Sequence, residues 1–502
     1  MGSAKQSKKF QMLLIPFFAT SHIAPFTDLA FHLAAARPDA VEVTLAVTPA
    51  NASVVRSALA RRGQPDDATA AVNVKTYAFP AVDGLPPGIE NLSAIKGEDW
   101  LRINAAALNE GLMRPGQESL IREISPDAII TDMHFFWNVD VAADLGVPCT
   151  TFHVIGTFST LAMSHMELAG VSQTTTDGVA TVPHFPAPDI RIPDTELPYF
   201  LKSQQQEEEV GGVDITDARM GTALSRCFGL AVNTFSDLEH GYCELYVDNG
   251  YVKRAYFLGP LSLPLPETVP GGNSQCIEWL DKKPNNSVLY LCFGTFVPVS
   301  DAQLQELALG LEASGKPFLW VVRSDSWAPP EEWTERVGDR GMVITGWAPQ
   351  TAILAHPAVG AFVTHCGWNS VLETIVAGVP VLTWPVVFEQ FITERFVTQV
   401  LAIGARMSPE GAGVRSTRHK ENDLVPAKVV AQAVSAFMEP GGEGDAARSR
   451  VKELSVKARA AMADGGSSHR DLRRLIDDLM EARSAARKAG THGAALSSDI
   501  VS

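Results

Sequence analysis

Short apolar runs alternate with amphipathic stretches of helical period along most of this 502-residue chain. Such alternation is typical of parallel sheets whose strands are connected by helices, so the chain is predicted to have an α/β fold. In the first half the expected strands are 11–17, 41–47, 127–132 and 231–235. In the second half they are 287–294, 318–323, 342–345, 360–365 and 379–384. Helices are expected from about Pro25 to Ala36 and from Asp301 to Ser314, where Gly315 stops the second one.

A stretch rich in Pro and Gly, residues 259–273, interrupts this alternation and is predicted to be a domain linker. We therefore expect a first domain over 1–258 and a second over 274–485, with a last helix that packs back on the first domain. Residues 486–502 are predicted to form a disordered tail. Open parallel sheets bind ligands at the carboxyl ends of their strands, so the cleft between two such domains is the expected site.

The overall composition excludes several classes of partner. A net charge of −16 and a pI near 5.2 make nucleic acid an unlikely ligand. No apolar stretch approaches the roughly 20 residues that a membrane span needs. The six cysteines form no CxxC pair, which favours buried thiols in a reducing compartment, the cytoplasm. The protein is expected to be a monomer.

The richest segment for chemistry is WAPQTAILAHPAVGAFVTHCGWNSVLETIVAGVPVLTWPVVFEQ, residues 347–390. Within it the strand GAFVTH leads through Cys366-Gly367 to a helix that Asn369 or Ser370 is expected to cap. That helix ends at Gly378. A strand–glycine–helix turn directs free backbone N–H groups and the positive helix end at one point, which suits a diphosphate.

Parts of this segment have a purely structural interpretation as well. Ser370 and Glu373 fit a capping box, which would explain both residues as a helix start. His365 at a strand end could be structural, and Trp347 and Trp368 could be core aromatics. The residues alone leave these alternatives open.

The 44 residues from WAPQ through HCGWNS and LE to the closing EQ resemble, without a gap, the signature box of plant family-one UDP-dependent glycosyltransferases. The stretches 276–295, 232–239 and 256–261 are similar to that family too. The resemblance implies a GT-B fold, in which two Rossmann-like domains face each other across a cleft. It also implies an enzyme of plant secondary metabolism whose first domain binds the acceptor and whose second binds the nucleotide sugar.

The resemblance also implies a role for each residue that matches the family's motif. Trp347 would stack on uracil, Gln350 and Glu373 would bind the ribose, and Trp368, Glu389 and Gln390 would contact the sugar. In the family, members whose signature box ends in Gln use UDP-glucose, so Gln390 implies glucose as the donor sugar. The residue before that Gln is commonly Asp in the family and is Glu389 here. The residues expected at the donor site are Thr295, Trp347, Ala348, Gln350, His365, Trp368, Asn369, Ser370, Glu373, Glu389 and Gln390. Of these, Thr295, His365, Asn369 and Ser370 would bind the diphosphate.

His22 follows the first strand, where a neutral imidazole could remove a proton from an acceptor hydroxyl. Asp132 ends another strand and is the best candidate to orient that imidazole. Taken alone, both could be structural. The family resemblance implies a histidine and an aspartate at these places, with Ser21 here replacing a glycine. A single displacement with His22 as general base would invert the anomeric carbon and give a β-glucoside.

No Asp-x-Asp occurs in the sequence, so neither a metal nor another cofactor is expected besides UDP-glucose as co-substrate. A flat phenol such as a flavonoid is the leading acceptor, while terpenoids, hormones and attack by carbon, nitrogen or sulfur stay open. A nucleotide-sugar epimerase or hydrolase and a non-catalytic UDP-sugar binder are the competing functions. Aromatic side chains that either line an acceptor pocket or belong to the core are Phe135, Phe136, Trp137, Phe152, Phe158, Tyr199 and Phe200.

Overall fold

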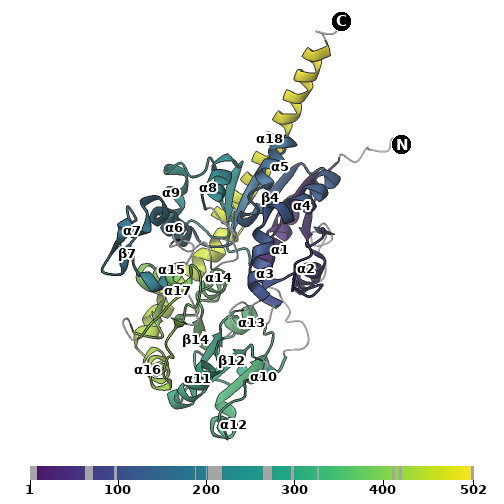
Figure 1. The fold of residues 1–502 in the computed structure, drawn as a ribbon. Helices are drawn as coiled ribbons and strands as arrows, with labels where there is room; N and C mark the ends of the chain where they lie inside the picture. The colour runs from purple at the N-terminus through teal and green to yellow at the C-terminus, as the bar shows by residue number, and fades with distance from the viewer. Residues whose placement is uncertain are drawn as a thin grey trace.

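The computed structural model contains two parallel sheets, each covered by helices, in separate halves of the chain (Figure 1). Together they form the predicted two-domain α/β architecture. The described residues are 8–62, 72–94, 99–186, 188–198, 201, 217–263, 274–294, 299–324, 327–409, 413–417 and 421–498.

The first sheet has the strand order β10-β9-β5-β4-β1-β2-β3, and all its pairs are parallel. Its central strands are buried on both faces, as expected for a sheet between two helix layers. The strands are β1 (Phe10–Ile15), β2 (Val41–Val47), β3 (Val72–Thr76), β4 (Ala128–Asp132), β5 (Cys149–His153), β9 (Gly229–Val232) and β10 (Ala255–Phe257). The helices of this half are α1 (Thr20–Ala36), α2 (Pro49–Arg61), α3 (Asp99–Leu108), α4 (Glu110–Ile124), α5 (Asn138–Asp144), α6 (Thr157–Ala169), α7 (Val171–Thr174), α8 (Asp217–Arg226) and α9 (Tyr242–Asp248).

The second sheet has the order β13-β12-β11-β14-β15-β16 and is also parallel throughout. Its strands are β11 (Val288–Cys292), β12 (Phe318–Val322), β13 (Gly341–Thr345), β14 (Val359–Thr364), β15 (Val381–Thr383) and β16 (Gly404–Arg406). The helices around it are α10 (Ser274–Leu280), α11 (Asp301–Ser314), α12 (Trp333–Val337), α13 (Gln350–Ala355), α14 (Trp368–Ala377), α15 (Gln390–Arg395), α16 (Ala427–Phe437) and α17 (Glu443–Met462).

Two helices show how well local signals predicted boundaries. Helix α11 has the predicted bounds, because the Ser300 hydroxyl caps its start and Gly315 adopts a left-handed φ of 66° at its end. Helix α1 was expected to begin at Pro25 but begins at Thr20. His22 therefore lies in the first helical turn and not in a loop. Pro25 has no N–H to donate to the carbonyl oxygen of Ser21 in the turn before it. It is tolerated there because that oxygen accepts a hydrogen bond from Asn369 instead.

The Pro- and Thr-rich segment after α7 contains a small antiparallel sheet with the order β6-β7-β8. Its strands are β6 (Thr175–Thr176), β7 (Val179–Thr181) and β8 (Arg191–Pro193), and the turn η4 (Asp194–Glu196) follows. Glu196 forms buried ion pairs with Arg395 and Arg415 of the second half, at 2.5 and 3.2 Å. Arg415 also pairs with buried Glu394. These four side chains, hereafter the ionic seam, attach the antiparallel sheet to the second domain.

The last helix, α18 (Ser467–Ser498), leaves the second domain and runs along and beyond the first (Figure 1). Leu472, Leu475 and Ile476 pack in the core around β1 and β2, and Arg487 pairs with Asp127 at 2.5 Å. The tail predicted from 486 is therefore wrong up to Ser498, since this Ala-rich sequence favours helix. The predicted domain boundary in 259–273 lies mostly outside the described residues and stays a prediction.

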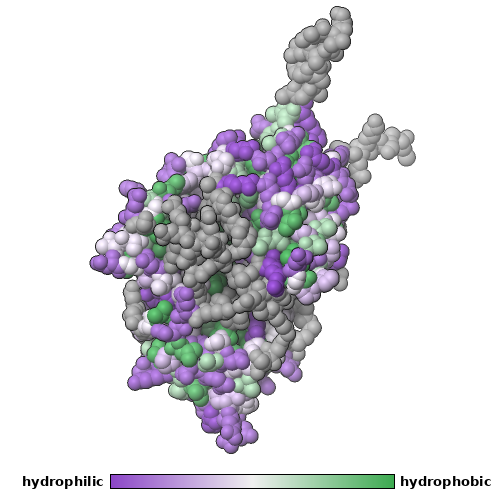
Figure 2. Space-filling view, in the orientation of Figure 1, coloured by the Kyte–Doolittle hydropathy of each residue, from purple (hydrophilic) through white to green (hydrophobic). Residues whose placement is uncertain are grey.

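All six cysteines are free and buried. Within the described ranges, no helix combines the length and apolar character needed to span a membrane. Outside the grey residues, the face in Figure 2 is mainly hydrophilic, with hydrophobic side chains in small separate patches.

Candidate active site

A cavity of about 590 Å³ lies between the two domains, at the carboxyl ends of strands from both sheets. Residues of the first domain, including His22 and His134, line one part of it. Residues of the segment 347–390 line the other part. The structure thus brings the two predicted groups of site residues to one space, as the position of the strand ends requires.

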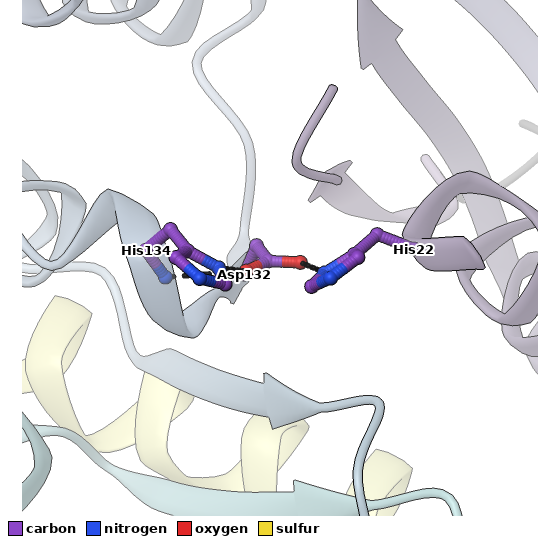
Figure 3. Close-up of side chains that lie close together, drawn as sticks. All are labelled: His22, Asp132 and His134. Carbon is purple, nitrogen blue, oxygen red and sulfur yellow. Dashed lines mark hydrogen bonds and ion pairs between the residues drawn. The ribbon is translucent and has the colours of Figure 1, made fainter. Parts of the chain in front are cut away.

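Asp132 lies between the imidazoles of His22 and His134, which line the first-domain side of this cavity (Figure 3). Its Oδ2 is 2.8 Å from Nδ1 of His22 and accepts a 3.3 Å bond from the backbone N–H of Phe17. Its Oδ1 is 2.7 Å from Nδ1 of His134 and accepts from the backbone N–H of that residue at 3.1 Å. His22 comes from the first turn of α1, and His134 from the short turn η3 (Met133–Phe135) that follows β4.

Asp132 is fully buried, yet it is held in its ionised form. Burial would raise the pKa of this carboxyl, but the charge of His22 and the hydrogen bonds from His134 and His22 outweigh it and lower the pKa below the ordinary value. A carboxylate that stays ionised only accepts hydrogen bonds, so it fixes Nδ1 of His22 as the protonated ring atom. Nε2 of His22 then carries the lone pair that a general base needs.

On the second-domain side, the N-terminus of α14 faces the cavity. The structure excludes the capping-box interpretation, because the helix begins at Trp368 with Gly367 as its N-cap and without a side-chain cap. Ser370 and Glu373 instead both accept hydrogen bonds from the side-chain amide of Gln350, at 3.0 and 2.7 Å. Gln350, Ser370 and Glu373 all line the cavity.

Two carboxyl groups in the donor half are destabilised as anions. Burial raises the pKa of Glu373 to about 7, against the opposing effect of the bond from Gln350. Burial likewise raises the pKa of Glu389 to about 7. A ligand that donates hydroxyl hydrogen bonds to these carboxylates would favour their ionised form, so both fit a sugar or ribose ring.

His365 follows β14, and its imidazole is enclosed by backbone. A Cβ atom at Gly367 or Gly294 would lie 2.4 or 2.7 Å from its Nε2, so only glycine fits at both positions. Burial lowers the pKa of His365 to about 4, which keeps the ring neutral. Its buried Nδ1 has no partner among the described residues, as expected for a group that meets a ligand.

The two tryptophans differ in their surroundings. The Trp347 side chain is 49% exposed at the edge of the cavity, where its ring face could stack on a base. Trp368 is buried, and its indole N–H donates to the carbonyl of Asn233 in the first domain at 2.8 Å. A Cβ at Gly156 would lie 2.7 Å from its ring, so Trp368 also joins the domains.

Gln390 lines the cavity, but its side-chain oxygen already accepts hydrogen bonds from within the protein. Its Oε1 accepts from the backbone N–H groups of Val386 and Val387, at 3.0 and 3.1 Å. Only the Nε2 donor is left for a sugar hydroxyl. The amide therefore fixes the loop before α15 and can offer one kind of hydrogen bond.

Among the expected acceptor aromatics that the structure describes, only Phe136 lines the cavity. Phe135, Phe152 and Phe158 are fully buried in three different core clusters, so the pocket interpretation is wrong for these three. Trp137 is buried too. Their rings pack on neighbouring aromatics, as between Phe26 and Phe152.

Ala348 is half-buried and lines the cavity, and its role in binding the donor stays a prediction. Predicted site residues Thr295, Tyr199 and Phe200 lie outside the described residues.

Sequence reasoning missed two histidines of the cavity wall. His134 stands two residues after Asp132, so a second polar side chain just beyond a strand end was the signal available. His153 ends β5, lines the cavity and has a pKa lowered to about 4 by burial.

A family model described as UDP-glucoronosyl and UDP-glucosyl transferase matches residues 273–410. UDP-glycosyltransferase 73E1 of Stevia rebaudiana is 36% identical, over 93% of this chain and 96% of its own. The scopoletin glucosyltransferase of Nicotiana tabacum is 35% identical, over 94% and 98%. A crystal structure of Glycyrrhiza uralensis UGT73P12 with glycyrrhetinic acid 3-O-monoglucuronide has a TM-score of 0.84 and 30% identity, over 98% of this chain and 100% of that one.

Proposed function

Because this chain belongs to the plant family-one UDP-dependent glycosyltransferases, we propose that it transfers glucose from UDP-glucose to a hydroxyl group of a small lipophilic acceptor. The observation that carries this proposal is His22, which is hydrogen-bonded to the buried Asp132 and lines the same cavity as the donor-site residues of 347–390. An acceptor and a nucleotide sugar can therefore meet beside a histidine of fixed tautomer.

In the proposed reaction, Nε2 of His22 accepts the proton of the acceptor hydroxyl as its oxygen attacks the anomeric carbon. A carbon–oxygen bond to the acceptor forms while the bond to UDP breaks, with inversion to a β-glucoside. Asp132 stabilises the imidazolium that results. The UDP anion is stabilised by the N-terminus of α14 and the neutral ring of His365, which both line the cavity.

For the donor, Trp347 would hold the base, Gln350 and Glu373 the ribose, and Glu389 and Gln390 the glucose ring. The raised pKa values of both glutamates support hydroxyl-rich partners at these positions. For the acceptor, a phenol is favoured, since scopoletin, the compound in the name of one relative, is itself a phenol. The apolar lining residues Phe136, Met163 and Leu224 suit a ring system.

The test is turnover of UDP-glucose with a panel of phenolic, terpenoid and flavonoid acceptors. Mass spectrometry should find a hexose added only when an acceptor is present, and NMR should find the β anomer. Conversion of UDP-glucose to another nucleotide sugar without an acceptor would instead indicate an epimerase. UDP-glucose binding without turnover of any acceptor would indicate a binding protein.

We also propose that the enzyme works without metal or other cofactor, as a cytoplasmic monomer. The missing Asp-x-Asp and the six free cysteines support these points. Turnover after exhaustive EDTA treatment should equal that of untreated enzyme, and a loss restored by magnesium or manganese would refute metal independence. Light scattering should give one chain of 54.0 kDa, and a fluorescent fusion should label the cytoplasm.

A further inference from the structure

Asp132 fixes the tautomer of two imidazoles, and the reaction uses only one of them. Its two carboxylate oxygens accept from Nδ1 of His22 and from Nδ1 of His134, one oxygen for each ring. In their neutral forms both histidines therefore carry a lone pair on Nε2. No described residue is hydrogen-bonded to either Nε2.

Both rings line the same cavity, and their centroids are 5.2 Å apart. Each is partly exposed, with 16% of the His22 side chain and 25% of the His134 side chain accessible. The first-domain part of the cavity, hereafter the acceptor chamber, therefore presents two hydrogen-bond acceptors, one from each of the rings on either side of Asp132 (Figure 3). A single hydroxyl bound to His22 would leave the second acceptor, on His134, without a partner.

We infer that the acceptor carries two hydroxyl groups on neighbouring carbons, one that reacts over His22 and one that donates to Nε2 of His134. This inference rests on the proposed function and adds the class of acceptor, a catechol or a vicinal diol. Hydroxyls at opposite ends of a flat molecule cannot reach two rings in contact, whereas hydroxyls on adjacent carbons can. His134 thus determines specificity without taking the proton.

The physical basis is the cost of an unpaired polar group. When an acceptor with one hydroxyl excludes water from the chamber, Nε2 of His134 loses its hydrogen bonds to water and gains none. A net hydrogen bond of usual strength corresponds to a preference of about three- to tenfold for the diol.

The variant His134→Phe removes the ring nitrogen with little other change. His134 stacks on Phe17 with centroids 4.3 Å apart, and a phenyl ring can keep that contact. Asp132 keeps a donor at each oxygen, because its Oδ1 still accepts from the backbone N–H of residue 134. The substitution leaves the hydrogen bond between His22 and Oδ2 of Asp132 in place.

The experiment compares three acceptors built on whichever scaffold the enzyme glucosylates: a 1,2-dihydroxy, a 1,3-dihydroxy and a monohydroxy form. For the wild type, kcat/KM should be highest for the 1,2-dihydroxy form. In His134→Phe that advantage should fall at least threefold, and kcat/KM for the monohydroxy form should not fall, because no ring nitrogen is then left unpaired. Phe136→Leu is the matched control, since it alters an apolar wall of the same cavity and should leave the ratio unchanged.

Three results would overturn the inference. The first is an equal kcat/KM of the wild type for the monohydroxy and 1,2-dihydroxy forms. The second is a higher kcat/KM for the 1,3-dihydroxy form. The third is an equal loss of kcat/KM for all three acceptors in His134→Phe. The last result, with a shifted pH profile, would make His134 a positioning residue that acts through Asp132. Failure of every hydroxylated acceptor would instead refute the proposed function.

Discussion

The side-chain amide of Asn369 donates a 2.7 Å hydrogen bond to the carbonyl oxygen of Ser21, across the cleft between the two domains. That carbonyl lies four residues before Pro25 in α1, and proline has no N–H to donate to it. Asn369 therefore replaces the missing helical bond one residue before His22. The start of the donor helix α14 and the start of the helix that holds the base are joined directly.

Replacing Asn369 with Asp should test this bond and the donor site together. A carboxylate cannot donate to the Ser21 carbonyl, and it would repel a diphosphate at the α14 N-terminus. We expect affinity for UDP-glucose to fall at least tenfold, about 1.4 kcal/mol, by calorimetry. Asn369→Ala loses the donor without the repulsion and should lose less. Equal affinity in the Asp variant would remove Asn369 from the diphosphate site.

His22→Ala should lower kcat by about 10²–10⁴, the usual contribution of a general base, and leave UDP binding nearly intact. The reason is that His22 lies on the first-domain wall, whereas the nucleotide residues lie on the second-domain wall. Steady-state turnover of a hydroxyl acceptor and calorimetry with UDP give the two quantities. Full activity in the variant would exclude His22 as the base.

Gln390 allows two substitutions that separate its loop contacts from its contact with the sugar. Gln390→Glu keeps an oxygen for the N–H groups of Val386 and Val387 but removes the Nε2 donor. We expect its thermal stability to be preserved and its kcat/KM for UDP-glucose to fall at least tenfold, about 1.4 kcal/mol.

In Gln390→His, kcat/KM for UDP-glucose should fall by a similar factor. The thermal stability should fall too, because the shorter side chain leaves the N–H groups of Val386 and Val387 unpaired. Its ratio of UDP-galactose to UDP-glucose use should rise, as competition between the two donors would measure. Unchanged donor preference in a folded His variant would confine Gln390 to a structural role.

The affinity for UDP-glucose should fall as pH falls below 7. Glu373 and Glu389 have pKa values of about 7 in the free protein, and sugar hydroxyls bind their ionised forms. Protonation between pH 8 and pH 6 should therefore raise Kd by about tenfold for each carboxyl that contacts the ligand. UDP-glucose is a better probe than UDP, whose terminal phosphate titrates in the same range.

Glu373→Gln and Glu389→Gln should each remove one of these contributions, so the slope of log Kd against pH should decrease in each variant. A pH-independent Kd in the wild type would contradict contact of either carboxyl with the sugar or ribose.

The donor half of the site was predictable because its residues are consecutive in sequence. A strand, a glycine turn and a helix place His365, Asn369 and Glu373 together by local geometry alone. The acceptor half was not predictable, since its wall comes from separate segments such as those of Leu92, Asn104, Met163, Leu201 and Met220.

Side-chain type does not distinguish a core ring from a lining ring, which is why the sequence left Phe152 and Phe158 open between the pocket and the core. Strand ends were predicted within a few residues, whereas the start of α1 was not, because Pro25 suggested a helix start. The partner that makes Pro25 tolerable, Asn369, is 344 residues away. A contact between residues so far apart in the sequence cannot be predicted from a local sequence pattern.

The ionic seam affects how this enzyme would release its products. Breaking a buried ion pair costs about 3–5 kcal/mol, so the antiparallel sheet should move with the second domain although the chain connects it to the first. When the domains separate to release UDP, the antiparallel sheet would move away from the first domain in the same motion. UDP should therefore slow hydrogen exchange in β7 and β8 as well as in α14. Protection confined to α14 would show that the sheet moves independently.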